Sequence, residues 1–158
     1  MRAATSDLAK PTRDQVQSIV DELSRPWGRV VLTCDGYEVT AAVRRAGALT
    51  FRICVYVNGW MRGEWLINDC EERRRFMRQG SRFLYSAKDR AEFIRRFGKR
   101  AARRHQIDRK IVIHRPDWTS ARSMLKHFCS NNSVVTVQAI GVTAERPAQS
   151  VDGGAVQP

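Results

Sequence analysis

The first regular pattern along the chain is the spacing of apolar residues after Thr12. Val16, Ile19, Val20 and Leu23 recur at the i, i+3, i+4, i+7 spacing of one helix face. The four residues that begin with Thr12, TRDQ, are typical of a capping box, which closes the start of a helix. A proline and a glycine soon end the pattern, so the fold is predicted to begin with a short amphipathic helix.

The next segment alternates apolar and polar positions, which indicates β-strands. Asp35-Gly36 supplies the two positive φ values of a tight hairpin turn. A two-residue turn pairs Cys34 with Tyr37 and Leu32 with Val39. Because the apolar sides of the two strands then match, this register is the expected one.

A second hairpin is predicted at Asn58-Gly59, directly after the strongest strand pattern, Leu49 to Val57. Trp60 to Trp65 should then pair back as an edge strand, where Arg62 and Glu64 discourage aggregation. Together these patterns predict an antiparallel meander of about four strands.

The second half of the chain mixes helical and strand patterns. Helices are predicted over 69–79, 87–105 and 118–129, and strands over 109–114 and 133–140. Gly98 inside the second helix costs roughly 1 kcal/mol relative to Ala, so a kink or an early end stays open there. The expected fold is α+β: a β-meander with an N-terminal helix, two to three further helices and one or two additional strands.

Composition divides the 158 residues into three parts. Residues 1–11 are predicted to be a disordered lead, 12–141 a single α+β domain, and 142–158 a disordered tail. The lead lacks the apolar stretch of a secretory signal, and no apolar run reaches the ~20 residues of a membrane helix. Four cysteines without C-x-x-C spacing suit reduced, structural thiols. A cytoplasmic protein without membrane contact is expected.

The net charge of +12 is concentrated in one segment. Between Arg73 and Lys110, 15 basic residues face 3 acidic ones, and the remainder of the chain has 13 of each. A local surplus indicates a contact surface for an anionic partner. The alternative is a merely solubilising surface, and the arginines near 73–78 also suit the end of a helix, where the dipole favours cations.

Within the predicted helix 87–105, the charges fall on one side. At ~100° per residue, Phe93, Ile94, Phe97 and Ala101 share an apolar arc that suits docking on a sheet. The opposite arc holds Lys88, Arg95, Arg96, Lys99, Arg100 and Arg103. These six residues, with Arg73, Arg74 and Arg78, form the candidate site for nucleic acid or another anionic partner. Because both phenylalanines fall on the docking arc, no exposed platform for base stacking is expected on this helix.

Catalytic and metal-binding patterns are not evident. The chain contains no G-x-S-x-G, no H-E-x-x-H and no Walker loop. His127 and Cys129 fall short of a four-ligand zinc site. A protein that is not an enzyme, without metal or cofactor, is expected, while a Cys–His pair assembled by the fold or a metal-dependent enzyme stays open.

Three segments carry a resemblance: YVNGWMRGEW at 56–65, FGKR at 97–100 and W-x-S-x(3)-ML-x-HFC at 118–129. They look like segments of small proteins encoded by bacteriophages and prophages, over about residues 28–140. The resemblance implies an accessory protein that acts on components of the host cytoplasm. It assigns no catalytic or binding residue.

Two functions are therefore expected. The leading one is nucleic-acid binding, to DNA or RNA, through phosphate contacts from the one-sided Arg/Lys helix. The alternative is a phage accessory protein that binds and modulates a host protein or nucleoprotein complex, for example as an inhibitor of a defence system.

Overall fold

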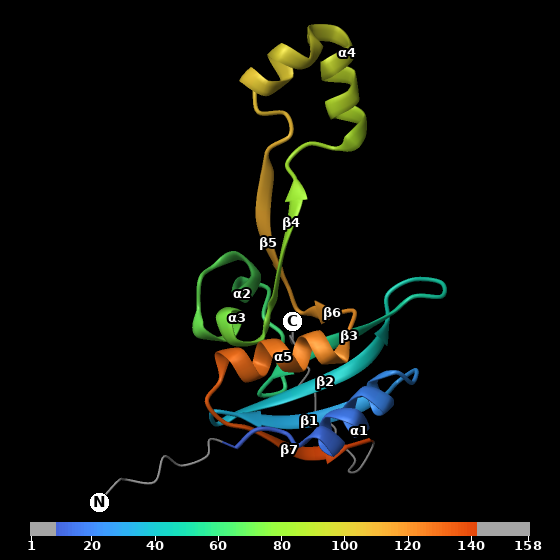
Figure 1. Cartoon of the computed structure of the whole chain (residues 1–158), viewed down its shortest axis with the longest axis vertical. Coiled ribbons are helices and arrows are strands. Elements are labelled where there is room, and N and C mark those ends of the chain that lie inside the picture. Colours follow the sequence, from blue (N-terminus) through green and yellow to red (C-terminus); the bar gives the residue numbers. More distant parts are fainter. Residues whose placement is uncertain (1–8, 142–158) are drawn as a thin grey trace, which may run out of the picture.

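A five-stranded antiparallel sheet forms the body of the protein, in a computed structural model that describes residues 9–141 (Figure 1). The strand order is β6-β3-β2-β1-β7. The strands are β1 (Arg29–Cys34), β2 (Tyr37–Arg45), β3 (Phe51–Val57), β6 (Asp117–Trp118) and β7 (Val135–Ile140). Helices and strands together confirm the predicted α+β class.

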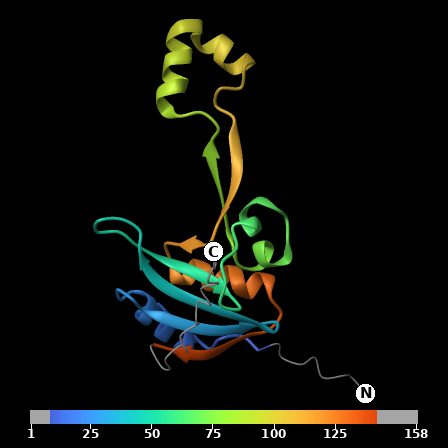
Figure 2. The same ribbon diagram turned by 180° about the vertical axis from the view of Figure 1, so that it is seen from behind.

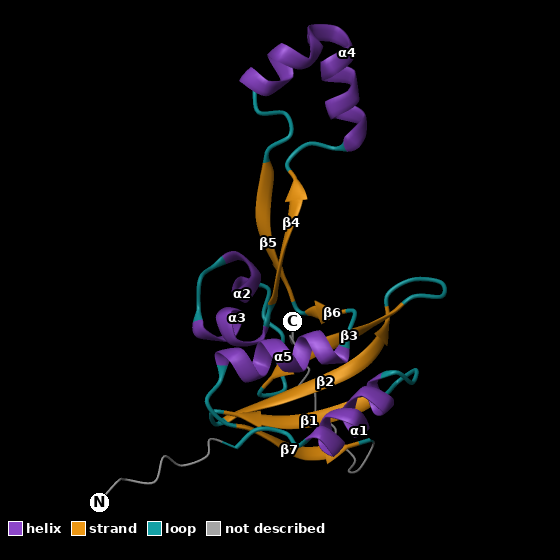
Figure 3. Ribbon diagram, viewed as in Figure 1, coloured by secondary structure: helices purple, strands orange, loops and turns teal. Residues whose placement is uncertain are grey.

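Helices cover one face of this sheet (Figure 3). They are α1 (Arg13–Leu23) and α5 (Ala121–Asn131), with the short α3 (Glu71–Phe76) beside α5 and α2 (Glu64–Ile67) beside α3. Every second residue of the central strands points at the helices, so Leu32, Val39 and Val55 are fully buried. The rings of Phe76 and Phe128, 5.4 Å apart, join α3 to α5.

The predictions for the first two elements are confirmed. Thr12 and Gln15 form both hydrogen bonds of the capping box at the start of α1. In the first hairpin, Cys34 pairs with Tyr37 and Leu32 with Val39. The turn residues Asp35 and Gly36 have φ of 46° and 88°, the positive values that the hairpin requires.

The predicted edge strand from Trp60 to Trp65 is wrong. Only Trp60 pairs with Val57, in an isolated bridge, and the chain then turns into α2. The outer edge of β3 is already taken by β6, through the pair Ile53 and Trp118. The helical turn instead brings Trp65 into the core, where 9% of the residue is exposed.

Two predicted helices have different bounds. The helix predicted over 69–79 ends at Phe76, because β4 (Arg78–Phe83) pairs with β5 (Lys110–Arg115) in a separate ribbon. The helix predicted over 118–129 begins at Ala121, where the Ser120 side chain caps it. Trp118 lies in β6 instead, and its burial confirms that it packs in the core.

The predicted tail and residues 1–8 of the predicted lead lie outside the described residues. Residues 9–11 are attached to the body. The backbone oxygen of Ala9 accepts a hydrogen bond from the Val135 amide at 2.8 Å. The ammonium of Lys10 donates to the backbone oxygen of Cys129 at 2.8 Å. The prediction of a disordered lead is therefore wrong for these residues.

The β4–β5 ribbon carries α4 (Ala87–Arg104) away from the sheet, as opposite views show (Figure 1, Figure 2). At Gly98 the backbone adopts φ 85° and ψ 165°, so α4 consists of two helical pieces, 87–97 and 99–104. This backbone region is open essentially only to glycine. Of the two outcomes left open for Gly98, the kink is the one found.

Candidate nucleic-acid interface

The far end of the ribbon, residues 82–110, is termed the basic tip here. It contains eleven Lys and Arg and three acidic residues, so it carries +8 of the net charge of +12. Figure 3 shows this region as two helical pieces at the end of a two-stranded ribbon. The charge surplus therefore lies on a small module held out from the body.

Arg90 joins the two ends of the basic tip. Its guanidinium carbon lies 3.6 Å from the centre of the Phe83 ring, in a cation–π contact. Its Nη1 also lies 3.3 Å from Oδ1 of Asp108. The Arg90 side chain thus links the strand end, the first helical piece and the loop before β5.

A small apolar cluster closes the basic tip on itself. Ala102 and Ile107 are 4% and 7% exposed, and the Ile107 amide donates to the Ala102 carbonyl at 3.1 Å. The Phe93 ring lies 5.6 Å from that of His105. The predicted docking of this helix on the sheet is therefore wrong, because the ribbon holds α4 away from the sheet (Figure 1) and Phe93 packs within the tip instead.

A single continuous helical wheel does not describe residues 87–105. Gly98 changes the direction of the helix, so the ~100° spacing does not continue from one piece to the next. The first piece presents Lys88, Arg95 and Arg96, and the second presents Lys99, Arg100 and Arg103. Five of the six lie within five residues of Gly98 in the sequence, and the kink divides the set between the two helical pieces.

These six cations are solvent-exposed, and within residues 9–141 none of them forms an ion pair. Two of the three acids in the tip are engaged elsewhere. Asp89 accepts from the Ser86 hydroxyl at 2.7 Å, at the start of α4, and Asp108 pairs with Arg90. The third acid, Glu92, lies one helical turn from Lys88 and from Arg96 but forms no ion pair within residues 9–141. The mutual repulsion of the six cations is therefore only partly offset.

The arginines of the earlier part of the segment sit at the body and have partners. Arg74 holds Asp69 with two hydrogen bonds of 2.9 Å, which lower the pKa of that carboxyl. Arg78 donates from Nε to the Asp117 carbonyl at 2.9 Å. Arg73 reaches the Ile67 carbonyl at 3.4 Å. The structure therefore separates Arg73, Arg74 and Arg78 from the cations of the tip.

Some tip residues were missed by the periodicity argument. Arg104 is exposed on the second helical piece, and Arg82, Arg109 and Lys110 lie where the ribbon meets the tip. The count of basic residues between Arg73 and Lys110 includes these four, whereas the helical wheel did not place them on the basic side. Phe97 is 60% exposed, so the expectation that both phenylalanines lie on a buried docking side is wrong for Phe97.

Comparisons of this chain with protein-family models, curated proteins and solved structures returned no match. Within residues 9–141, no helix combines the length and apolar character needed to cross a membrane. Function must then be argued from the geometry and chemistry of the site itself.

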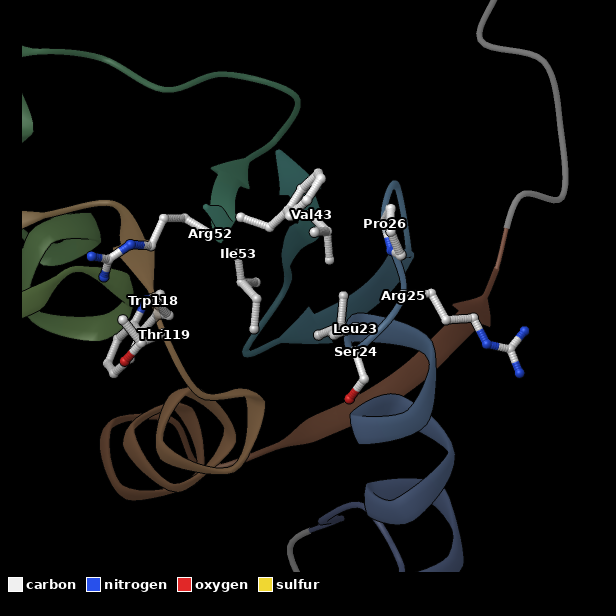
Figure 4. A pocket seen from close by; sticks show the side chains of 10 residues that line it. Leu23, Ser24, Arg25, Pro26, Val43, Arg52, Ile53, Trp118 and Thr119 are labelled. Carbon is white, nitrogen blue, oxygen red and sulfur yellow. The ribbon is translucent and has the colours of Figure 1, made fainter. Parts of the chain in front are cut away.

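A cavity of about 210 Å³ lies between α1, β3 and β6 (Figure 4). Arg25 and Arg52 extend from it in opposite directions, so their charges do not converge. The described residues that line it include no acid, histidine or cysteine: Leu23, Ser24, Arg25, Pro26, Val43, Phe51, Arg52, Ile53, Trp118 and Thr119. Ser24 and Thr119 bring hydroxyls to the cavity, but none of these lining residues is a general base that would activate them.

The histidines and cysteines of the described region do not form a recognisable centre. No group of three His, Cys, Asp or Glu side chains in residues 9–141 could hold a metal ion. Nε2 of His127 lies 3.2 Å from the Arg74 carbonyl, and burial lowers the pKa of its imidazole. Burial also raises the pKa of the Cys34 thiol to about 12, so this thiol stays protonated at neutral pH.

Proposed function

We propose that the protein binds nucleic acid through the basic tip, by contacts to the phosphate backbone. The observation that carries this proposal is the set of six exposed, unpaired cations on a module held away from the body. Self-repulsion among these cations is relieved when an anionic polymer neutralises them. Releasing the counterions of that polymer supplies further affinity.

The shape of the molecule supports the same partner. The six-residue strands β4 and β5 give a ribbon of about 20 Å. Two-stranded ribbons and helices are the elements that fit nucleic-acid grooves. Five of the tip's six candidate cations flank the kink, and four of the six are arginines, whose planar fork suits phosphate oxygens.

The test compares three forms of the full chain. Lys99→Glu with Arg103→Glu reverses two cations one helical turn apart in the tip. Arg122→Glu with Lys126→Glu makes the same charge change at the same spacing on α5, where both residues are exposed. Fluorescence anisotropy with labelled duplex DNA, single-stranded DNA and RNA, over a salt series, measures affinity.

The tip variant is expected to lose roughly a hundredfold in affinity and to show a smaller salt slope, by about two. The α5 variant should lose much less affinity. Its two substitutions lie away from the tip, so they act on the bound polymer only through long-range electrostatics, which salt screens. Equal affinity of the wild type and the tip variant would overturn the proposal.

A second candidate, binding of a host protein complex, is favoured by a different surface. At the end of the sheet, Trp27, Leu49 and Phe51 are 59%, 94% and 42% exposed, and the Trp27 and Phe51 rings meet edge to face at 6.4 Å. Exposed aromatic clusters are common anchors of protein interfaces. This candidate predicts a stoichiometric complex that survives nuclease and is lost on Trp27→Ser with Leu49→Ser. A complex that nuclease removes would count against it.

A further inference from the structure

Phe97 is the most exposed phenylalanine of the protein, at 60% of its surface. It is the last residue of the first helical piece, immediately before the kink at Gly98. Exposing an apolar ring to water is unfavourable, and here the ring lies among the unpaired cations of the tip. The position therefore calls for a ligand with an apolar face.

The ring of Phe97 is supported from within the tip. The Phe93 ring lies 4.8 Å away at an interplanar angle of 43°, and Phe93 in turn meets His105. Side-chain packing of this kind limits the motion that a binding partner would have to freeze. Phe97 is consequently both exposed and held in place.

The surroundings of Phe97 are strongly cationic. Arg96 precedes it, with its guanidinium carbon 6.0 Å from the ring centre, and Lys99 and Arg100 follow Gly98. An apolar protein surface or a lipid chain would have to desolvate these charges without pairing them. A nucleotide offers a flat base for the ring and a phosphate for the cations.

Phe83 provides a contrast inside the same tip. Arg90 sits 3.6 Å from its ring centre and Lys110 lies 4.9 Å from it, so its ring is occupied by the protein's own cations. Phe97 has a cation only at 6.0 Å, and its ring stays the more exposed of the two, at 60% against 38% for Phe83.

We propose that Phe97 stacks on a nucleobase of the bound nucleic acid. The ligand class is nucleic acid with an accessible base face, supplied either by a single strand or by a duplex step that opens. This inference rests on the proposed function and deepens it, because phosphate contacts alone require no aromatic residue.

The test uses the full chain with Phe97→Ala, Phe97→Leu and Phe97→Tyr. The probes are a single-stranded oligonucleotide, the same strand with abasic sites throughout, an intact duplex, and a duplex with one mismatched step. Affinity is measured by anisotropy over a salt series. A 2-aminopurine base in the single strand and in the mismatched step reports stacking through fluorescence quenching by the wild type.

Phe97→Ala should weaken binding of the base-carrying strand roughly tenfold, without changing the salt slope. Phe97→Leu, which keeps apolar bulk, should weaken it similarly, and Phe97→Tyr, which keeps the ring, should restore it. On the abasic strand the wild type and Phe97→Ala should bind equally. If Phe97→Ala loses affinity only for the single strand, the stacked base comes from single-stranded nucleic acid. If it loses affinity only for the mismatched duplex, the base comes from a duplex step that opens.

Equal ratios of wild-type to Phe97→Ala affinity on base-carrying and abasic strands would overturn the stacking role, as would absence of 2-aminopurine quenching. The proposed function would survive that result if Lys99→Glu with Arg103→Glu still weakens binding roughly a hundredfold. Failure of the wild type to bind any probe would overturn both. Circular dichroism and thermal melting establish that each variant is folded.

Discussion

The guanidinium of Arg75 lies 2.7 Å from Oδ2 of Asp35, and this ion pair joins α3 to the first hairpin of the sheet. The same carboxylate accepts the backbone amides of Ser133 and Val134 at 2.8 and 2.7 Å. Arg75 also donates to the Asn132 side chain at 2.9 Å. Three segments distant in sequence thus meet at Asp35, on the body and away from the basic tip.

Replacing Asp35 with Ala should lower the free energy of unfolding by about 2–3 kcal/mol, because it leaves two backbone amides without their acceptor and removes one of the two carboxylates that pair with Arg75. Urea denaturation followed by circular dichroism measures the change. Asp21→Ala, at an exposed position of α1, is the matched control and should cost no more than about 0.5 kcal/mol. Similar losses in both variants would contradict the role of Asp35.

Stability should also depend on pH through Asp35. The Ser133 and Val134 amides, followed by Arg75, hold the pKa of this carboxyl below its ordinary value of 3.8. Its folded pKa is therefore lower than its unfolded pKa. The stabilising contribution is present above the unfolded value and is lost as pH falls through the folded one.

A pH series of urea denaturations checks this expectation against Asp35→Asn, which cannot ionise. The gap in unfolding free energy between wild type and variant should be widest near neutral pH and narrow as pH falls below about 4. A gap that stays constant across the acid range would argue that the charge of Asp35 makes no contribution.

The sequence predicted the elements whose patterns are set by burial on one side. In β1 and β2 the alternation of buried and exposed positions, with the Asp35-Gly36 turn, defines both the strands and their register. β4 escaped prediction because it lies in a ribbon away from the sheet, where most of its residues are exposed and no alternation results. Its pairing depends on β5, about thirty residues later.

The candidate site was predictable as a set of residues but not as a geometry. Counting charges along the sequence located the cations of the tip, because a count does not depend on the direction in which each side chain points. The helical wheel failed beyond Gly98, whose backbone angles depend on how the tip packs on itself. Phe97 precedes the kink, and its ring is exposed because α4 does not reach the sheet on which the wheel predicted it to dock (Figure 1).

Arg90→Ala should unfold the basic tip and leave the body intact. The substitution removes both the contact with Phe83 and the pair with Asp108, which hold the two ends of the tip together. Hydrogen exchange should rise across 83–109 with the sheet still protected. Arg100→Ala, at an exposed unpaired position, is the control and should leave exchange unchanged. Global unfolding by Arg90→Ala would contradict an independently stabilised tip.

Gly98→Ala should change the shape of the tip without changing its charge. An alanine Cβ meets no atom within 4 Å there, so the cost comes from the backbone angles and is about 1–3 kcal/mol. Straightening α4 relieves this strain, and nucleic-acid affinity should fall although every cation remains. Gly63→Ala also meets open space but at an ordinary φ of −59°, and it should bind like the wild type. Unchanged affinity for Gly98→Ala would show that the kink is unimportant for binding.

Arg74 and Arg96 should contribute differently to binding, although both belong to the basic segment. Two hydrogen bonds of 2.9 Å commit the Arg74 guanidinium to Asp69, whereas Arg96 is exposed and has no carboxylate partner in residues 9–141. Arg96→Ala should weaken binding several-fold and reduce the salt slope by about one, as expected for one lost phosphate contact. Arg74→Ala should alter neither quantity in the same anisotropy titrations. Equal losses in the two variants would instead place the body surface around α3 within the nucleic-acid footprint.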